Sequence, residues 1–246
     1  MYLVKNLLVD VGNTLIKTAL SDAGGIKDYR NWNEVTALTD YAVSEKVSQV
    51  FISSVTDRHE KIATSLEKVA NVKIFSKETP LPIKVHYKTK DTLGLDRIAA
   101  IMGAYELFPD QNNLVIDIGT CITYDFLDRT GNYYGGAISP GISIRLRSLH
   151  DYTSKLPQIE ISDHKKWPEV TGDSSANSIL SGVINGILFE IEGFISTYSR
   201  QYELLNTIIT GGDSYRFEST IKPHIFVAPK LILIGLNRIL IENEEN

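Results

Sequence analysis

Several common sequence features are scarce or missing in this chain of 246 residues. It contains one cysteine, Cys121, so an intrachain disulfide and a zinc site built from several thiolates are both excluded. No apolar run approaches the length of a membrane-spanning helix, and the apolar start of the chain is interrupted too soon for a signal peptide. We therefore expect a cytoplasmic globular protein.

Basic residues are also fewer than acidic residues. Lys and Arg number 25 against 30 Asp and Glu, which gives a net charge of −5. Nucleic-acid-binding domains usually carry a clustered basic surface, so this balance argues against a nucleic-acid partner. It leaves room for a local basic pocket that binds an anionic ligand. With 43% hydrophobic residues, the chain can bury a core as one large domain or two small ones.

Two familiar nucleotide-binding signatures are absent from the sequence. There is no Gly-x-x-x-x-Gly-Lys-[Ser/Thr], which argues against a P-loop kinase. There is no Gly-x-Gly-x-x-Gly either, which removes the simplest dinucleotide-binding fold. Any nucleotide chemistry must therefore use a different phosphate-binding element.

What the sequence does contain is an alternation of short apolar runs and segments with helical spacing. The runs predict strands at 3–11, 15–20, 50–55, 72–75, 114–117, 122–127 and 208–210, and the spacing predicts helices at 57–70, from 94 onward and at 173–201. This alternation favours a layered α/β fold. The polar stretch 152–170 has the composition of a linker, and the glycine-rich stretch 135–141 is expected to form a loop.

An internal repeat is the most informative feature. The run Leu8–Thr14 (Leu-Val-Asp-Val-Gly-Asn-Thr) recurs as Val115–Thr120 (Val-Ile-Asp-Ile-Gly-Thr), and a second β-like run follows each copy. The repeat predicts a duplicated fold, with halves at 1–112 and 113–246 and a central cleft between them.

Each copy offers a carboxylate at the end of a strand, followed by a tight glycine turn. The glycine lets the backbone approach a bulky anion, and the turn amides can hydrogen-bond phosphate oxygens. A carboxylate beside phosphate requires a bridging cation, usually Mg²⁺ through water, and Asp10 is the residue we assign to it. The predicted ATP-binding residues are Asp10, Val11, Gly12, Asn13, Thr14, Lys17, Gly119, Thr120, Gly211 and Gly212. For either copy alone, a plain β-hairpin turn is the alternative.

The order and spacing of five motifs resemble those of type III pantothenate kinases, within the acetate–sugar kinase–actin superfamily. The motifs are Asp10–Thr14, Gly94–Arg97, Asp117–Thr120, Gly135–Gly141 and Thr210–Asp213, and they span most of the chain. The resemblance implies duplicated ribonuclease H-like (actin-like ATPase) domains and ATP-dependent phosphorylation of pantothenate to 4′-phosphopantothenate, the first step of coenzyme A biosynthesis. It also implies Mg²⁺, a monovalent cation (K⁺ or NH₄⁺), and a homodimer with its active sites at the interface.

The same resemblance assigns roles to individual residues. Asp96 falls on the catalytic base, although a first-turn or capping acid of the following helix is the alternative. Asp117 falls on the monovalent-cation ligand. The implied substrate-binding residues are Tyr87, Gly94, Leu95, Asp96, Arg97 and Ser175, with Ser174 as the alternative to Ser175. A surface salt bridge is the alternative for Arg97, and a half-buried strand aromatic is the alternative for Tyr87.

Two other functions stay open on the sequence. One is a different small-molecule kinase of the same superfamily, such as a sugar kinase, although a sugar should need more Asp, Asn and Glu around it. The other is an idle accessory or regulatory binding protein. Against the second, an idle site has no need of carboxylates as costly to bury as Asp10, Asp96 and Asp117. Gly182 and Gly186, four apart on the predicted long helix, allow close packing within the chain or across a dimer seam.

Overall fold

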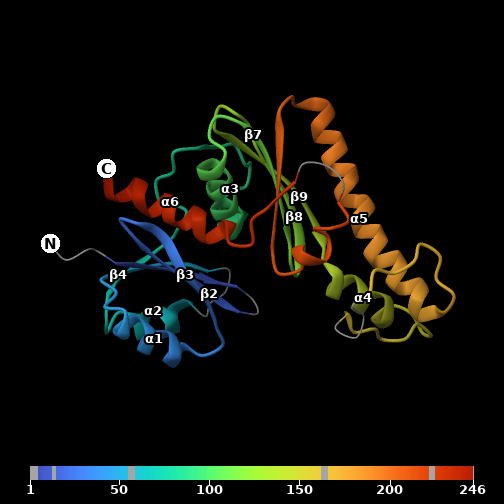
Figure 1. The fold of residues 1–246 in the computed structure, drawn as a ribbon, viewed down its shortest axis with the longest axis horizontal. Helices are drawn as coiled ribbons and strands as arrows, with labels where there is room; N and C mark the ends of the chain where they lie inside the picture. Colours follow the sequence, from blue (N-terminus) through green and yellow to red (C-terminus); the bar gives the residue numbers. More distant parts are fainter. Residues whose placement is uncertain (1–4, 13–14, 55–58, 162–165, 222–224, 246) are drawn as a thin grey trace. The chain divides into compact units, whose positions relative to one another are not determined.

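The fold is taken from a computed structural model that describes residues 5–12, 15–54, 59–161, 166–221 and 225–245. The chain divides into two compact units (Figure 1). The first comprises Met1–Pro109, Gly131–Tyr133 and Lys230–Asn246, and the second comprises Asp110–Thr130 and Tyr134–Pro229. Because these units are discontinuous in sequence, they do not test the division into repeat halves at residue 112, which stays a prediction.

The first unit is a mixed sheet with helices on both faces (Figure 1). Its strand order is β3-β2-β1-β4-β5, with β1 antiparallel to β2 and parallel to β4. The elements are β1 (Asn6–Val11), β2 (Ile16–Asp22), β3 (Gly25–Trp32), α1 (Val35–Ser44), β4 (Gln49–Ser54), α2 (His59–Leu66), β5 (Asn71–Ile74), β6 (Lys84–Val85), a 3₁₀ turn (Lys90–Thr92), α3 (Leu95–Leu107) and α6 (Leu231–Glu245).

The central strand β1 is buried on both faces, which explains its continuous apolar run. Leu7 and Val9 pack in one cluster with Leu38 of α1 and Leu66 of α2. Helices α3 and α6 cover the opposite face of the sheet (Figure 1).

Helices α3 and α6 themselves touch backbone to backbone. A Cβ added to Gly235 would lie 1.8 Å from the Ala99 carbonyl oxygen, and one added to Gly103 would lie 2.3 Å from the Leu231 carbonyl oxygen. Any larger residue at Gly103 or Gly235 would therefore force the two helices apart.

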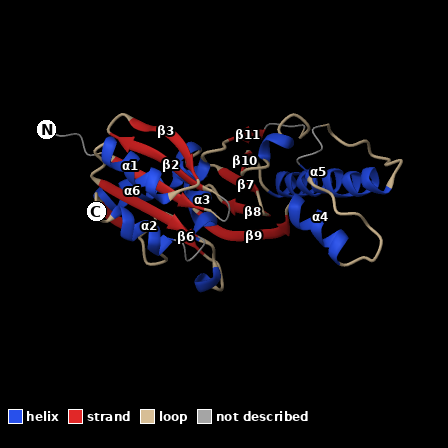
Figure 2. Cartoon of the chain, turned by 90° about the horizontal axis from the view of Figure 1, so that it is seen from below, coloured by secondary structure: helices blue, strands red, loops and turns tan. Residues whose placement is uncertain are grey.

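The second unit contains a sheet with a matching strand order. Its strands run in the order β11-β10-β7-β8-β9, in which β7 pairs antiparallel with β8 and parallel with β10, as β1 does with β2 and β4 (Figure 2). The elements are β7 (Asn112–Ile118), β8 (Cys121–Leu127), β9 (Asn132–Pro140), α4 (Ile142–Asp151), α5 (Ser175–Gln201), β10 (Leu205–Thr210), a 3₁₀ turn (Ser214–Arg216) and β11 (Ile225–Val227). The first two residues of β9 belong to the first unit and pair with β6.

Helix α5 supplies much of the core of the second unit. Ile187 and Ile191 are fully buried in one cluster with Ile116 and Tyr124 of the sheet. The helix is long and apolar enough to cross a membrane by length and composition alone, but 56% of its apolar window is buried inside the protein. A core helix explains this pattern. Helix α5 confirms the helix predicted at 173–201.

The loop predicted at Gly135–Gly141 is wrong, because β9 continues to Pro140. Gly135 has a φ of 90°, which favours glycine, and a Cβ on Gly136 would lie 1.6 Å from the Tyr124 carbonyl oxygen. The glycines that suggested a loop instead allow β9 to lie close against β8.

Candidate active site

The first turn that the sequence predicts to bind phosphate, called the first phosphate turn below, joins β1 to β2. Asp10 lies near the end of β1, opposite Lys17 of β2, and the Gly12 amide donates to the Leu15 carbonyl oxygen at 3.1 Å. Val11 is fully buried, so any contact with a ligand must come from its backbone. Asn13 and Thr14, which the sequence also assigns to ATP, lie outside the described residues.

The Asp10 carboxylate is unusual in being only 6% exposed. Burial raises its pKa to about 6, Lys17 opposes this rise, and repulsion from Asp96 adds to it. The ends of β1 and of α3 therefore bring two carboxylates of the first unit within electrostatic reach of each other. A divalent cation would relieve that repulsion, so these residues fit a Mg²⁺ site of the kind completed by substrate phosphates.

The start of α3 explains why the motif reads Gly-Leu-Asp-Arg. Gly94 is the N-cap and Leu95 the first helical residue, and Asp96 Oδ1 accepts a hydrogen bond from the Arg97 amide at 2.8 Å. A Cβ on Gly94 would lie 2.4 Å from Asp96 Oδ1, so glycine leaves the carboxylate its space. Asp96 is thus a first-turn acid, which does not conflict with a second role as a base.

Arg97 and Tyr87 lie together in the first unit. The guanidinium carbon of Arg97 lies 5.6 Å from the centroid of the Tyr87 ring, within cation–π range. Arg97 is only 6% exposed, so its alternative as a surface salt bridge is wrong. Tyr87 follows β6 and lies outside any strand, so its alternative as a strand aromatic is wrong as well.

The second phosphate turn joins β7 to β8 and has the same form. Asp117 lies near the end of β7, and the Gly119 amide donates to the Cys121 carbonyl oxygen at 3.0 Å. Thr120 is exposed at the tip of the turn.

The glycine turn at Thr210–Asp213 lies directly against this second turn. Gly211 has a φ of 99°, and a Cβ there would lie 2.4 Å from Asp117 Oδ1 and 2.3 Å from the Ile118 carbonyl oxygen. The Asp213 amide donates to the same Ile118 oxygen at 2.9 Å. The fold of the second unit thus joins two motifs that the sequence places more than 90 residues apart.

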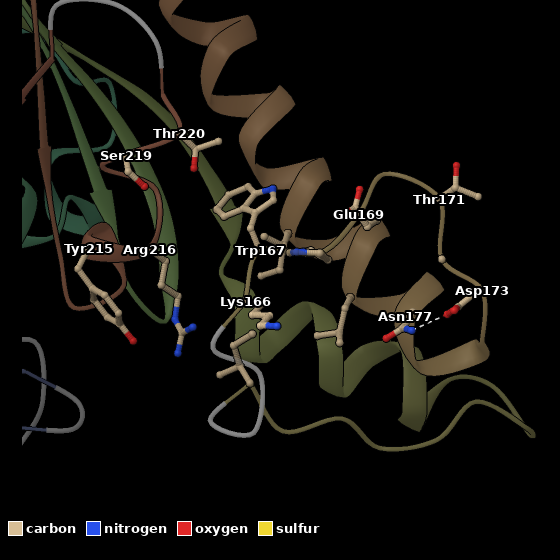
Figure 3. Close-up of a pocket in the computed structure, with 15 residues that line it drawn as sticks. Lys166, Trp167, Glu169, Thr171, Asp173, Asn177, Tyr215, Arg216, Ser219 and Thr220 are labelled. Carbon is tan, nitrogen blue, oxygen red and sulfur yellow. Dashed lines mark hydrogen bonds between the residues drawn. The ribbon is translucent and has the colours of Figure 1, made fainter.

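A cavity of about 880 Å³ opens in the second unit (Figure 3). Lys166 and Trp167 line one part of it, and Tyr215 and Arg216, which follow the Gly211 turn, line another. The Arg216 guanidinium lies 5.1 Å from the centroid of the Tyr215 ring. Sequence reasoning missed these residues, and their only signal was a position just after a glycine turn suited to nucleotide.

Ser174 and Ser175 both lie at the start of α5. The Ser174 hydroxyl oxygen caps the helix by accepting from the Asn177 amide at 3.2 Å, whereas Ser175 is the exposed first helical residue. The cap gives Ser174 a structural role and leaves Ser175 as the better candidate for substrate.

Comparison with known proteins agrees with this arrangement. A family model described as type III pantothenate kinase matches residues 6–197. The type III pantothenate kinase of Cytophaga hutchinsonii is 44% identical over 96% of this chain and 98% of its own.

Solved structures share the fold at low sequence identity. Component A of (R)-2-hydroxyglutaryl-CoA dehydratase from Acidaminococcus fermentans aligns over 99% of this chain and all of its own, with a TM-score of 0.57 and 15% identity. A glucokinase from an Antarctic psychrotroph aligns over 97% of this chain and 99% of its own, with a TM-score of 0.52 and 14% identity. The mixed α/β fold is therefore that of actin-like ATPases and sugar kinases.

Proposed function

The chain belongs to the type III pantothenate kinase family, and from this premise we propose how its residues transfer a phosphoryl group from ATP to pantothenate. The products are 4′-phosphopantothenate and ADP, and the reaction is the first step of coenzyme A biosynthesis. The observations that carry the proposal are geometric: Asp10 is buried near the end of β1 beside the turn closed by Gly12, and Asp96 lies in the first turn of α3. Asp10 is the carboxylate that would bind a metal ion. Asp96 is the carboxylate that would accept the proton of the substrate hydroxyl.

Asp96 is the general base in this proposal. The primary hydroxyl oxygen of pantothenate attacks the γ-phosphorus of ATP, the bond to the β,γ-bridging oxygen breaks, and the hydroxyl proton passes to the Asp96 carboxylate. Most of the rate enhancement comes from orientation and from stabilisation of charge on the transferred group.

Arg97 binds the carboxylate of pantothenate through two parallel hydrogen bonds. Its burial strengthens this pairing, because a guanidinium shielded from water attracts an anion more strongly than an exposed one. Tyr87 supports the guanidinium from one side, and Gly94, Leu95 and Ser175 complete the substrate contacts.

Each of the two phosphate turns contributes to ATP binding in this proposal. Lys17, beside the first turn, neutralises phosphate charge. In the second turn Gly119 lets the backbone approach phosphate, and the Thr120 hydroxyl donates to a phosphate oxygen. Asp10 would hold Mg²⁺, and the ion would supply neutralisation of the phosphate charge. The matching strand orders of the two units support the duplicated architecture. The central cleft stays a prediction from the sequence repeat.

The cavity lined by Tyr215 and Arg216, which follow Gly211 and Gly212 in the sequence, takes the adenosine of ATP. The position of Tyr215 and Arg216 just after the glycine turn supports this assignment, as do the Tyr215 and Trp167 side chains in the cavity wall.

We also propose a cytoplasmic homodimer with its active sites at the interface, and the outer face of α5 supports the dimer. Gly182, Gly186 and Gly193 would each meet nothing within 4 Å if a Cβ were added, so packing within the chain does not require these glycines. Phe189 lies between them and is 57% exposed. Small residues flanking an exposed aromatic at helical spacing form a self-complementary surface on which a second α5 can pack.

The proposal is tested by ADP release from ATP in the presence of pantothenate and Mg²⁺, with K⁺, NH₄⁺ or Na⁺ as the only monovalent cation. Release should require pantothenate and should fall away in Na⁺ alone. Release with a sugar in place of pantothenate would support the sugar-kinase alternative. If folded, dimeric protein released no ADP in any salt, the idle accessory reading would replace ours.

Replacing Asp117 by Ala should lower kcat by roughly 10-fold or more in saturating K⁺ and remove the difference between K⁺ and Na⁺. The reason is that the carboxylate beside Gly211 is the proposed cation ligand. Steady-state kinetics in the two salts measure both effects, and Asp151→Ala, at the exposed end of α4, should match the wild type. Potassium dependence that survives Asp117→Ala unchanged would remove this residue as the ligand.

A further inference from the structure

One cluster of ionisable side chains lies outside the proposed site. Glu190 of α5 accepts hydrogen bonds from Tyr124 of β8 at 2.8 Å and from Ser139 of β9 at 3.1 Å. It also forms an ion pair with Arg145 of α4. Burial alone raises the pKa of Glu190, but hydrogen bonds from Arg145, Tyr124 and Ser139 outweigh it and hold the pKa below its usual value. The carboxylate therefore stays charged and ties four elements together.

The Arg145 guanidinium donates hydrogen bonds on two sides. Its Nη2 donates to Glu190 and to Ser139 Oγ, while its Nε donates to the carbonyl oxygen of Pro140 at 2.7 Å. A planar guanidinium holds both partners at fixed angles, which a lysine ammonium cannot do. The ion pair between Arg145 of α4 and Glu190 of α5 thus fixes the position of Pro140, the last residue of β9.

The next residue, Gly141, carries this constraint to the second phosphate turn. Its amide donates to the Thr120 carbonyl oxygen at 3.0 Å, and a Cβ on it would lie 2.1 Å from the Gly119 carbonyl oxygen. The turn and Gly141 are in backbone contact, so a shift of one moves the other. A continuous path of contacts therefore leads from Glu190 through Arg145, Pro140 and Gly141 to Thr120.

We infer that Arg145 and Glu190 are positioning residues that hold the Gly119–Thr120 turn in the geometry needed to bind ATP phosphates. The inference rests on the proposed function, in which this turn binds ATP. Neither side chain touches substrate. Because ATP binding depends on where the turn lies, loss of the pair should weaken the binding of ATP. The binding of pantothenate, which is assigned to Arg97 and its neighbours, should be largely unaffected.

The decisive variant is Arg145→Lys, which keeps the charge and removes the planar guanidinium. We expect the KM for ATP to rise about 10-fold, and the KM for pantothenate to stay within about 2-fold of the wild type. The Kd for MgADP, measured by calorimetry without pantothenate, should rise in parallel. The matched control is Arg238→Lys in the ion pair of α6, whose two side chains are exposed to a similar degree, 27% and 25% against 20% and 24%. It should leave both KM values unchanged.

A second variant separates positioning from stability. Arg145→Met alone leaves a partly buried carboxylate without its cation, so it is combined with Glu190→Met, which replaces the pair by apolar side chains. Tyr124→Phe is added to remove the buried hydroxyl that would otherwise lose its acceptor. The triple variant should fold with a near-normal melting temperature and still show the raised KM for ATP, because the contact with Pro140 is lost. If the KM for ATP returned to the wild-type value together with the melting temperature, the pair would have only a structural role. That result would overturn the inference.

The direct binding measurement keeps this inference distinct from the proposed function. Wild-type protein that binds MgADP but does not phosphorylate pantothenate would refute the proposed function, and the effect of Arg145→Lys on binding would still decide the role of the pair. An unchanged Kd for MgADP in Arg145→Lys, or no nucleotide binding by the wild type, would overturn the inference.

Discussion

Asp96→Asn should lower kcat by about 10²- to 10⁴-fold, the range that general-base catalysis contributes in enzymes. Asparagine keeps an oxygen that can accept the hydrogen bond from the Arg97 amide, so the start of α3 should stay intact. It loses the ability to take the hydroxyl proton. The KM values for ATP and pantothenate should change much less than kcat, because substrate contacts from neighbouring residues persist.

Steady-state kinetics at saturating substrates measure this effect, and a thermal melt verifies the fold. The matched control is Asp91→Asn, an exposed acid in the 3₁₀ turn just before α3, which should keep normal turnover. Near-normal kcat in Asp96→Asn would remove Asp96 as the base and leave it only its role as a first-turn acid.

Asp10→Asn should abolish most turnover and at the same time stabilise the ligand-free protein. Burial raises the pKa of Asp10 from 3.8 to about 6, so the native state binds its proton more tightly than the unfolded chain does. Stability from this group is therefore fully present below pH 3.8 and is lost as the pH rises to about 6. At neutral pH the ionised carboxylate costs roughly 3 kcal/mol, which asparagine avoids.

For a chain of this size, that difference corresponds to a rise of several degrees in the melting temperature without nucleotide or Mg²⁺. Melting temperatures of both proteins between pH 4 and pH 8 measure it, and the gap should close toward pH 4. Asp28→Asn is a control in which the melting temperature should fall instead of rise. Hydrogen bonds from Arg30 and Tyr41 hold the pKa of the Asp28 carboxyl below its usual value, so its ionised form stabilises the folded protein. A less stable Asp10→Asn at pH 7.5 would contradict our account of the site.

The elements that the sequence predicted well are those with continuous apolar runs. Strands β1 and β7 are buried on both faces, and α5 carries a long apolar stripe, so their patterns are strong. Strand β3 was not predicted, because most of its residues are exposed and polar. Strand β9 was mistaken for a loop, because its glycines serve close packing on β8.

The site was predictable where motifs carry it and not where tertiary contacts make it. The Asp-x-Gly repeats identified both phosphate turns, and the resemblance identified Gly94–Arg97. Nothing in the spacing of Asp10 and Asp96 shows that they repel each other, because their proximity depends on how α3 packs against the sheet. The cavity wall at Lys166 and Trp167 comes from an irregular segment, which has no periodicity to detect.

Helix α6 has a consequence for how the protein is made. It packs backbone to backbone on α3, whose first turn carries Asp96, yet residues 231–245 leave the ribosome only after the whole of the second unit. Domains generally fold in the order of their synthesis, but here the earlier unit must wait for a helix encoded after the later one. A nascent chain thus cannot complete the unit that carries the proposed base until both units have been translated.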